Sequence, residues 1–149
     1  MYVLDTNILS EIMKKRSDTY AVYWLQDHPD EVCTTAITIE ELYFGVKMLP
    51  EGKRKETLKK QTEELVQDLA GRTLPLDAFS AYLCAELRVQ ELRSGRTPEI
   101  HDLMIAAIAK ANNCAVATRN VKDFGHLGVE VVNPFEYVPP AYGRVEAAD

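Results

Sequence analysis

The chain has 149 residues, of which 46% are hydrophobic and 27% charged, and its formal net charge at pH 7 is −6. This composition predicts one compact domain with its own core. The acidic balance argues against a module that reads DNA sequence through a basic surface, although it allows a carboxylate-rich metal site. We expect a soluble cytoplasmic protein without a membrane partner, because no apolar run approaches the ~20 residues of a membrane span and no signal peptide is evident. The three cysteines lack metal-binding spacing and are expected to be buried free thiols, which suits a reducing cytoplasm.

The first quarter of the chain alternates short apolar strands with helical segments. A strand at residues 3–4 leads into a helix that Thr6 or Asn7 is expected to cap. Another helical piece is expected over residues 21–26, and a second strand over residues 32–35.

The middle of the chain carries two helices and a further strand. Thr38 is expected to cap the first helix, with Glu41 three residues later at the capping-box position. Residues 50–52 end this helix, and a long amphipathic helix follows over residues 53–70. Residues 73–76 contain a proline and are therefore predicted to form an edge strand.

The last third repeats the alternation. Asp77 is expected to cap a helix that runs to about residue 93, and residues 102–112 form an alanine-rich helix that must be buried. Strands are predicted at residues 115–118 and 129–132. Alternating strands and helices predict a parallel sheet that is covered by helices on both faces.

Four acidic residues stand at the ends of these apolar elements. Asp5 ends the first strand, Glu41 and Asp102 lie in the first turns of helices, and Asp123 follows the penultimate strand. Ligands of open parallel sheets bind beyond the carboxyl ends of the strands, so we expect the four acids to meet at one edge. Such a cluster requires neutralising cations, and hard oxygen ligands favour Mg2+ or Mn2+. Candidates for supporting the site are Thr6, Asn7, Thr118 and Asn120.

Several alternatives remain open for these residues. Each acid taken alone could be a turn or capping residue. Glu40 is the alternative to Glu41, and only one of the two can face the site, because neighbouring residues of a helix point about 100° apart. An aspartyl-phosphate enzyme would need a second acid two residues after Asp5, where Asn7 stands. The basic run within residues 53–60 is either a solvated helix face or a surface for RNA or a protein partner.

Four motifs carry a family resemblance, at residues 4–11, 38–45, 102–107 and 118–124. In their order and spacing the chain resembles the PIN-domain ribonucleases, most closely the toxin subunits of VapBC-type and FitAB-type toxin–antitoxin pairs. The resemblance extends from residue 1 to about residue 137 and leaves a polar tail at residues 138–149.

This resemblance implies a three-layer α/β/α fold with a four- to five-stranded parallel sheet. It implies Mg2+- or Mn2+-dependent cleavage of RNA through Asp5, Glu41, Asp102 and Asp123. Many members carry an acid where Asn120 stands, so Asp123 is expected to be a looser ligand. The resemblance also implies a homodimer and a small antitoxin that blocks the site, and it leaves a larger toxin–antitoxin assembly open.

Three functions are therefore compatible with the sequence. The leading one is a toxin ribonuclease, and the others are an RNA-processing PIN nuclease without an antitoxin and a non-catalytic interaction domain. The helices that begin near residues 38 and 53 are expected to offer a groove for an amphipathic antitoxin helix, from which an arginine would reach the carboxylates. The apolar residues that we expect to be exposed there are Tyr43, Phe44, Val46, Met48 and Leu49. Alternatively, these residues pack the two helices together.

Overall fold

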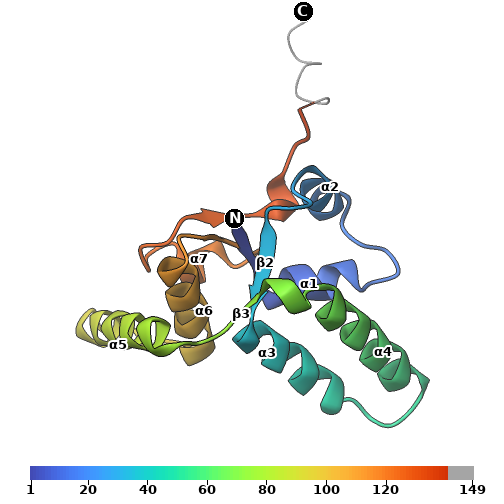
Figure 1. Cartoon of the computed structure of the whole chain (residues 1–149), viewed down its shortest axis with the longest axis horizontal. Coiled ribbons are helices and arrows are strands. Elements are labelled where there is room, and N and C mark those ends of the chain that lie inside the picture. The colour runs from blue at the N-terminus through green and yellow to red at the C-terminus, as the bar shows by residue number, and fades with distance from the viewer. Residues whose placement is uncertain (141–149) are drawn as a thin grey trace, which may run out of the picture.

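A computed structural model describes residues 1–140, and the greater part of the predicted polar tail lies outside the described residues. Five parallel strands form one sheet in the order β3-β2-β1-β4-β5, which confirms the predicted parallel sheet and places β3 at an edge (Figure 1). The strands are β1 (Tyr2–Leu4), β2 (Val32–Thr35), β3 (Thr73–Leu74), β4 (Ala115–Ala117) and β5 (Val131–Val132).

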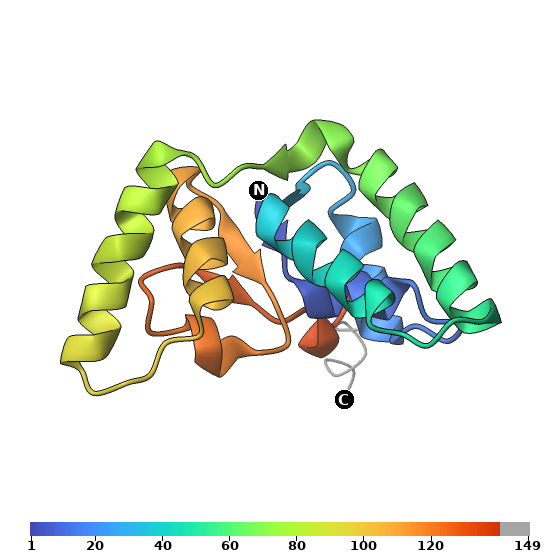
Figure 2. The ribbon, with the colours of Figure 1, turned by 90° about the horizontal axis from the view of Figure 1, so that it is seen from below.

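Helices cover both faces of this sheet, as the sequence predicts, and the pairs α3–α4 and α5–α6 form two helical hairpins at its flanks (Figure 2). Two short 3-10 helices, at Ala70–Arg72 and Pro134–Glu136, complete the described elements. The helices are α1 (Thr6–Ile12), α2 (Thr19–Asp27), α3 (Ala36–Lys47), α4 (Lys53–Asp68), α5 (Ala78–Arg93), α6 (Ile100–Ala111) and α7 (Val121–Phe124).

The core consists of two clusters, one on each face of the sheet. Val3 and Val116 pack with α5 and α6, whereas the next residues, Leu4 and Ala117, pack with α1 and α2. Successive side chains of a strand point to opposite faces, so each short central strand feeds both clusters. This arrangement is the three-layer α/β/α fold that was expected.

Two helix starts differ from the prediction. Thr35, rather than Thr38, caps α3, and its hydroxyl accepts a hydrogen bond from the amide of Thr38 at 3.1 Å. The capping-box role predicted for Glu41 is therefore wrong, because α3 starts directly where β2 ends. Similarly, α1 is capped by Asp5 and not by Thr6 or Asn7.

The type and order of the remaining elements agree with the prediction, but several bounds differ. The strands expected over residues 73–76 and 129–132 are shorter, at Thr73–Leu74 and Val131–Val132, and the helix expected over residues 53–70 ends at Asp68. Asp77 caps α5, as predicted, and Asp102 lies in the first turn of α6, two residues after its start at Ile100. All three cysteines are buried and free, which confirms that prediction. Within residues 1–140, no helix is long and apolar enough to cross a membrane.

Candidate active site

Asp5 lies at the carboxyl end of the central strand and is held there by three neighbours. It is 5% exposed, and its Oδ1 accepts a hydrogen bond from the amide of Thr6 at 2.7 Å. Its Oδ2 accepts from the hydroxyl of Thr118 at 2.8 Å and from the side-chain amide of Asn7 at 3.1 Å. The Asn7 amide also donates to Thr118 at 3.0 Å. These bonds join the ends of β1 and β4 and fix the orientation of the carboxylate.

Glu41 reaches the same place from α3. Its Oε1 accepts a hydrogen bond from the Thr6 hydroxyl at 3.1 Å, so Thr6 connects Glu41 to Asp5. Burial raises the pKa of Glu41, and the neighbouring Asp5 carboxylate raises it further. Glu40 instead points outward, with its side chain 56% exposed and 3.9 Å from His101. The structure thus directs Glu41, and not its neighbour, into the site.

Asp102 closes the group from the first turn of α6. Its carboxylate accepts no hydrogen bond from any other residue of the described chain. Burial raises the pKa of Asp102 to about 7, assisted by repulsion from Asp5, Asp123 and Glu41. Burial also raises the pKa of Asp5, with a contribution from Asp123. Asp5, Glu41 and Asp123 are therefore close enough to Asp102 to disfavour its ionisation.

Two hollows meet at Asp102. A cleft of about 400 Å3 is lined by Asp5, Glu41 and Asp102, together with Thr6, Asn7 and Asn120. A neighbouring hollow of about 310 Å3 contains Asp102 and Asp123. Thr118 is fully buried beneath the cleft. The structure thus brings three of the predicted acids into one cleft and places Asp123 in the adjoining hollow.

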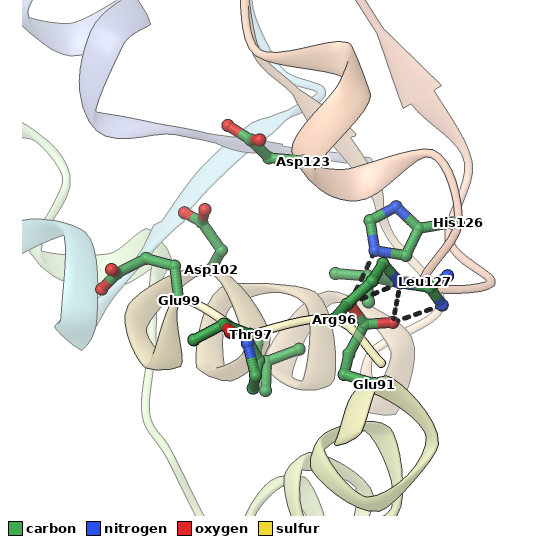
Figure 3. A pocket seen from close by; sticks show the side chains of 10 residues that line it. Glu91, Arg96, Thr97, Glu99, Asp102, Asp123, His126 and Leu127 are labelled. Atoms are coloured by element: carbon green, nitrogen blue, oxygen red, sulfur yellow. Dashed lines mark hydrogen bonds and ion pairs between the residues drawn. The ribbon is translucent and has the colours of Figure 1, made fainter. Parts of the chain in front are cut away.

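The second hollow has a different chemistry on its two sides (Figure 3). Asp102 and Asp123 lie on one side, near Glu99. On the other side the buried carboxylate of Glu91 accepts hydrogen bonds from Arg96 at 2.8 to 3.1 Å and from His126 at 2.9 Å. This Glu91 cluster was not predicted, because nothing in the sequence spacing of its three residues indicates that they meet.

Positive charge at the cleft was not predicted either. Arg119 and Lys14 line the cleft beside the acids, and both lie near the buried Glu11 carboxylate, at 4.0 and 2.6 Å. The Arg119 guanidinium additionally stacks 3.6 Å above the ring of Phe135. Arg119 belongs to the motif at residues 118–124, and its place in this motif is the sequence feature that could have indicated a cation at the cleft. A cation at the rim can bind a phosphate group of a substrate.

The donor set fits a hard divalent cation, because it consists of carboxylates with neutral hydroxyl and amide neighbours. Within residues 1–140, however, no three His, Cys, Asp or Glu side chains are already arranged to hold one metal ion. Joint coordination therefore requires that at least one acidic side chain changes its rotamer. Asp102 is the least constrained of the cleft acids, since Asp5 and Glu41 accept hydrogen bonds.

Comparison with known proteins identifies the family of this site. The model of the PIN domain matches residues 2–129. The chain belongs to the PIN-domain family. This match includes all four acids and all four supporting residues.

Related proteins are similar to this chain over almost their whole length. The chain is 38% identical to VapC ribonuclease Y4jK of Sinorhizobium fredii over 91% of this chain and 99% of the relative. It is 36% identical to toxin FitB of Neisseria gonorrhoeae, again over 91% and 99% of the two chains. The structure of FitAB bound to an IR36 DNA fragment superposes with a TM-score of 0.83 and 34% identity, covering 94% of this chain and 99% of that chain.

Proposed function

We propose that this PIN-domain protein is a Mg2+- or Mn2+-dependent ribonuclease that hydrolyses RNA phosphodiester bonds as the toxin of a VapBC- or FitAB-like pair. The ribonuclease and toxin relatives support this proposal. We assign the nuclease domain to residues 1–137, which include the whole family match. Three buried free thiols favour a reducing cytoplasm as the compartment.

The observation that carries the proposal is the lack of a compensating cation at Asp102. Its pKa is raised to about 7 by burial and by the surrounding carboxylates. Neither Asp5, Glu41 nor Asp102 forms an ion pair with a Lys or Arg of the described chain. Burial of a carboxylate without a compensating cation costs folding free energy. The presence of such a carboxylate at the cleft therefore favours binding of a metal cation from solution.

The proposed roles follow from the positions of the acids. Asp5, Glu41 and Asp102 would hold the principal ion, and Asp123 would help to hold a second ion or orient a water molecule. When bound, such an ion supplies a water of lowered pKa and positive charge near the reacting phosphate. Thr118 and Asn7 keep the Asp5 carboxylate in place, while Thr6 positions Glu41. Asn120 lines the cleft and is available for binding water or substrate.

Substitution of Asp5 by Asn tests the proposal directly. The variant should retain the fold, shown by circular dichroism, but lose Mn2+ binding in calorimetry and metal-dependent cleavage of RNA. The wild-type protein should likewise lose cleavage in excess EDTA. Full activity of Asp5→Asn, or undiminished activity in EDTA, would contradict the proposed chemistry.

An antitoxin is the proposed protein partner, and the groove between α3 and α4 is its proposed docking site. The groove has a volume of about 470 Å3 and is lined partly by Tyr43 and Val46. Phe44 on α3 and Met48, directly after its end, are 60% and 69% exposed. The expectation that Val46 is exposed is wrong, because it is buried at 7% and forms the floor between the helices. An amphipathic helix would cover the exposed residues, and a basic side chain from it would reach the carboxylates.

Co-purification with the product of a neighbouring small gene tests this docking site. Phe44→Glu should weaken binding of that product without affecting Mn2+ binding, because the charge enters an apolar contact. Tyr20→Glu on α2 serves as the control, because Tyr20 is also an exposed aromatic residue, at 50% against 60% for Phe44. Normal binding by Phe44→Glu would exclude this surface as the docking site.

A two-fold homodimer completes the proposal. Exposed apolar residues lie along one side of α5, and a second copy of the chain can cover them. Sedimentation at micromolar concentration should therefore show a dimer, and a monomer at that concentration would contradict this part of the proposal. These residues are Phe79, Tyr82, Val89 and Leu92.

A further inference from the structure

A positively charged groove lies between the end of α1 and the start of α4. It has a volume of about 430 Å3 and is lined by Lys14, Lys15, Lys53 and Arg54. No Asp or Glu side chain contributes to its lining. The concentration of four cations in one groove contrasts with the net charge of −6. The other lining residues are Ser10, Met13, Thr57, Leu58 and Gln61.

The basic residues of α4 differ in whether an acidic side chain of the described chain pairs with them. Lys55, Lys59 and Lys60 each pair with a glutamate four residues away, at 2.6, 3.9 and 3.9 Å. In contrast, Lys53 and Arg54 form no ion pair within residues 1–140. The groove therefore contains the cations of α4 that the described chain does not neutralise.

This groove adjoins the active-site cleft. Ser10 and Lys14 line both hollows, so the two share a wall along α1 and the segment that follows it. Glu11 holds Lys14 at this junction through a 2.6 Å ion pair and lies 4.0 Å from Arg119. A ligand in the groove can thus extend past these two cations to the carboxylates.

We propose that the groove binds the phosphate backbone of an RNA strand next to the bond that is cleaved. Lys15, Lys53 and Arg54 would contact phosphates, with Lys14 and Arg119 leading the strand into the cleft. Hydroxyl and amide groups of Ser10, Thr57 and Gln61 provide additional donors to phosphate or sugar oxygens. The first turn of α4 also lies at this groove and has no side-chain cap, so the positive end of its helix dipole adds to the potential.

The inference rests on the proposed ribonuclease function, since it concerns the substrate of that site. An acidic protein segment is the competing occupant. The shared wall with the carboxylate cleft favours RNA, because the backbone of a bound substrate must leave the cleft in some direction. In that direction the groove presents a series of positively charged side chains, which can bind successive phosphates of a polyanion.

Binding of a fluorescent single-stranded RNA to an Asp5→Asn background, measured at several salt concentrations, tests the groove without interference from cleavage. Lys53→Gln combined with Arg54→Gln should weaken binding by about threefold to tenfold. The slope of log affinity against log salt should become shallower by about 0.7 for each phosphate that the variant no longer binds. Lys59→Gln combined with Lys60→Gln removes the same charge from the same helix and should leave both quantities unchanged.

The outcomes separate this inference from the proposed function. If the wild-type protein cleaves RNA while both double variants bind RNA like their Asp5→Asn parent, the groove assignment is wrong and the ribonuclease remains. Equal weakening by both double variants would indicate a general charge effect and would also overturn the assignment. If the wild-type protein neither binds nor cleaves RNA, both proposals fail. Loss of antitoxin binding by the groove variant with unchanged RNA affinity would identify a protein partner instead.

Discussion

Asp102 and Glu91 lie on opposite sides of one hollow, yet their surroundings differ in one decisive respect (Figure 3). Glu91 is buried but accepts hydrogen bonds from Arg96 and His126. These bonds lower the pKa of Glu91, and those from Arg96 contribute more than the one from His126. Asp102 is half-buried, has no such partner within the described chain, and its pKa rises to about 7. Burial of a carboxylate is thus not by itself a sign of function.

What distinguishes the two residues is the source of the compensating charge. The chain itself supplies cations to Glu91, which therefore acts as a structural tie between the end of α5, the following loop and the turn after α7. Asp102 is surrounded by other acids, and its charge is compensated only when a cation arrives from solution. The comparison predicts opposite responses of the two sides to substitution, pH and metal.

The largest expected effect concerns the adjacent pair Glu41 and Glu40. Glu41→Gln should lower kcat/KM for RNA cleavage by at least about a hundredfold, since it removes an acid from the cleft. Glu40→Gln removes the same charge one residue away, where the side chain is exposed, and should change the rate less than about threefold. Similar rates for the two variants would show that the cleft geometry does not select the reactive acid.

Stability should respond in opposite directions on the two sides of the hollow. Glu91→Ala leaves Arg96 and His126 without their partner and should cost about 1–3 kcal/mol of unfolding free energy. Asp102→Asn relieves repulsion among the acids and should leave stability unchanged or raise it. Urea denaturation in EDTA measures both changes. A loss of stability in Asp102→Asn equal to that in Glu91→Ala would remove the distinction.

The pH dependence should separate the same two residues. The folded-state pKa of Asp102 lies above its ordinary value of 3.8, so the folded protein holds this proton more tightly than the unfolded chain. The resulting stabilisation is present at low pH and is lost as the pH rises through about 7. The pKa of Glu91 is lowered, so its contribution is present above its ordinary value and lost as the pH falls.

Thermal unfolding in EDTA provides the measurement for this pH dependence. From about pH 5 to about pH 8, the wild-type Tm should fall more than that of Asp102→Asn. Addition of Mn2+ should raise the wild-type Tm at the higher pH, because the ion binds only the folded protein. Parallel Tm curves for wild type and variant in EDTA would contradict a raised pKa at Asp102.

The smallest effect is expected from Asn120, which lines the cleft beside the acids. Asn120→Asp adds one more carboxylate and should increase Mn2+ affinity by about threefold to tenfold, since affinity for hard cations rises with the charge of the ligands. The same change should lower stability in EDTA slightly through added repulsion. Calorimetric titration with Mn2+ tests the gain, and an unchanged or weaker affinity would place this position outside the metal site.

The amino-acid sequence by itself indicates the alternation of strands and helices and the acids at the ends of apolar elements. Asp5 is the clearest case, since a parallel strand that ends in an acid presents it at the ligand-binding edge of the sheet. The sequence also shows that only one of Glu40 and Glu41 can face the site, because neighbouring residues of a helix point about 100° apart. The structure decides that this residue is Glu41. Both inferences depend on local periodicity, which the sequence displays directly.

Only the tertiary structure decides which side chains compensate one another. Nothing in the sequence indicates that Glu91 meets His126, or that Lys53 and Arg54 face a groove beside the end of α1. The pairs Lys59–Glu63 and Lys60–Glu64, in contrast, follow from their i, i+4 spacing on one helix. The helix caps differ from the prediction for a related reason, since Thr35 and Asp5 serve at once as strand end and helix cap. Hydrogen bonds and charge pairs depend on distances of a few ångströms between elements, and the packing of the whole chain sets those distances.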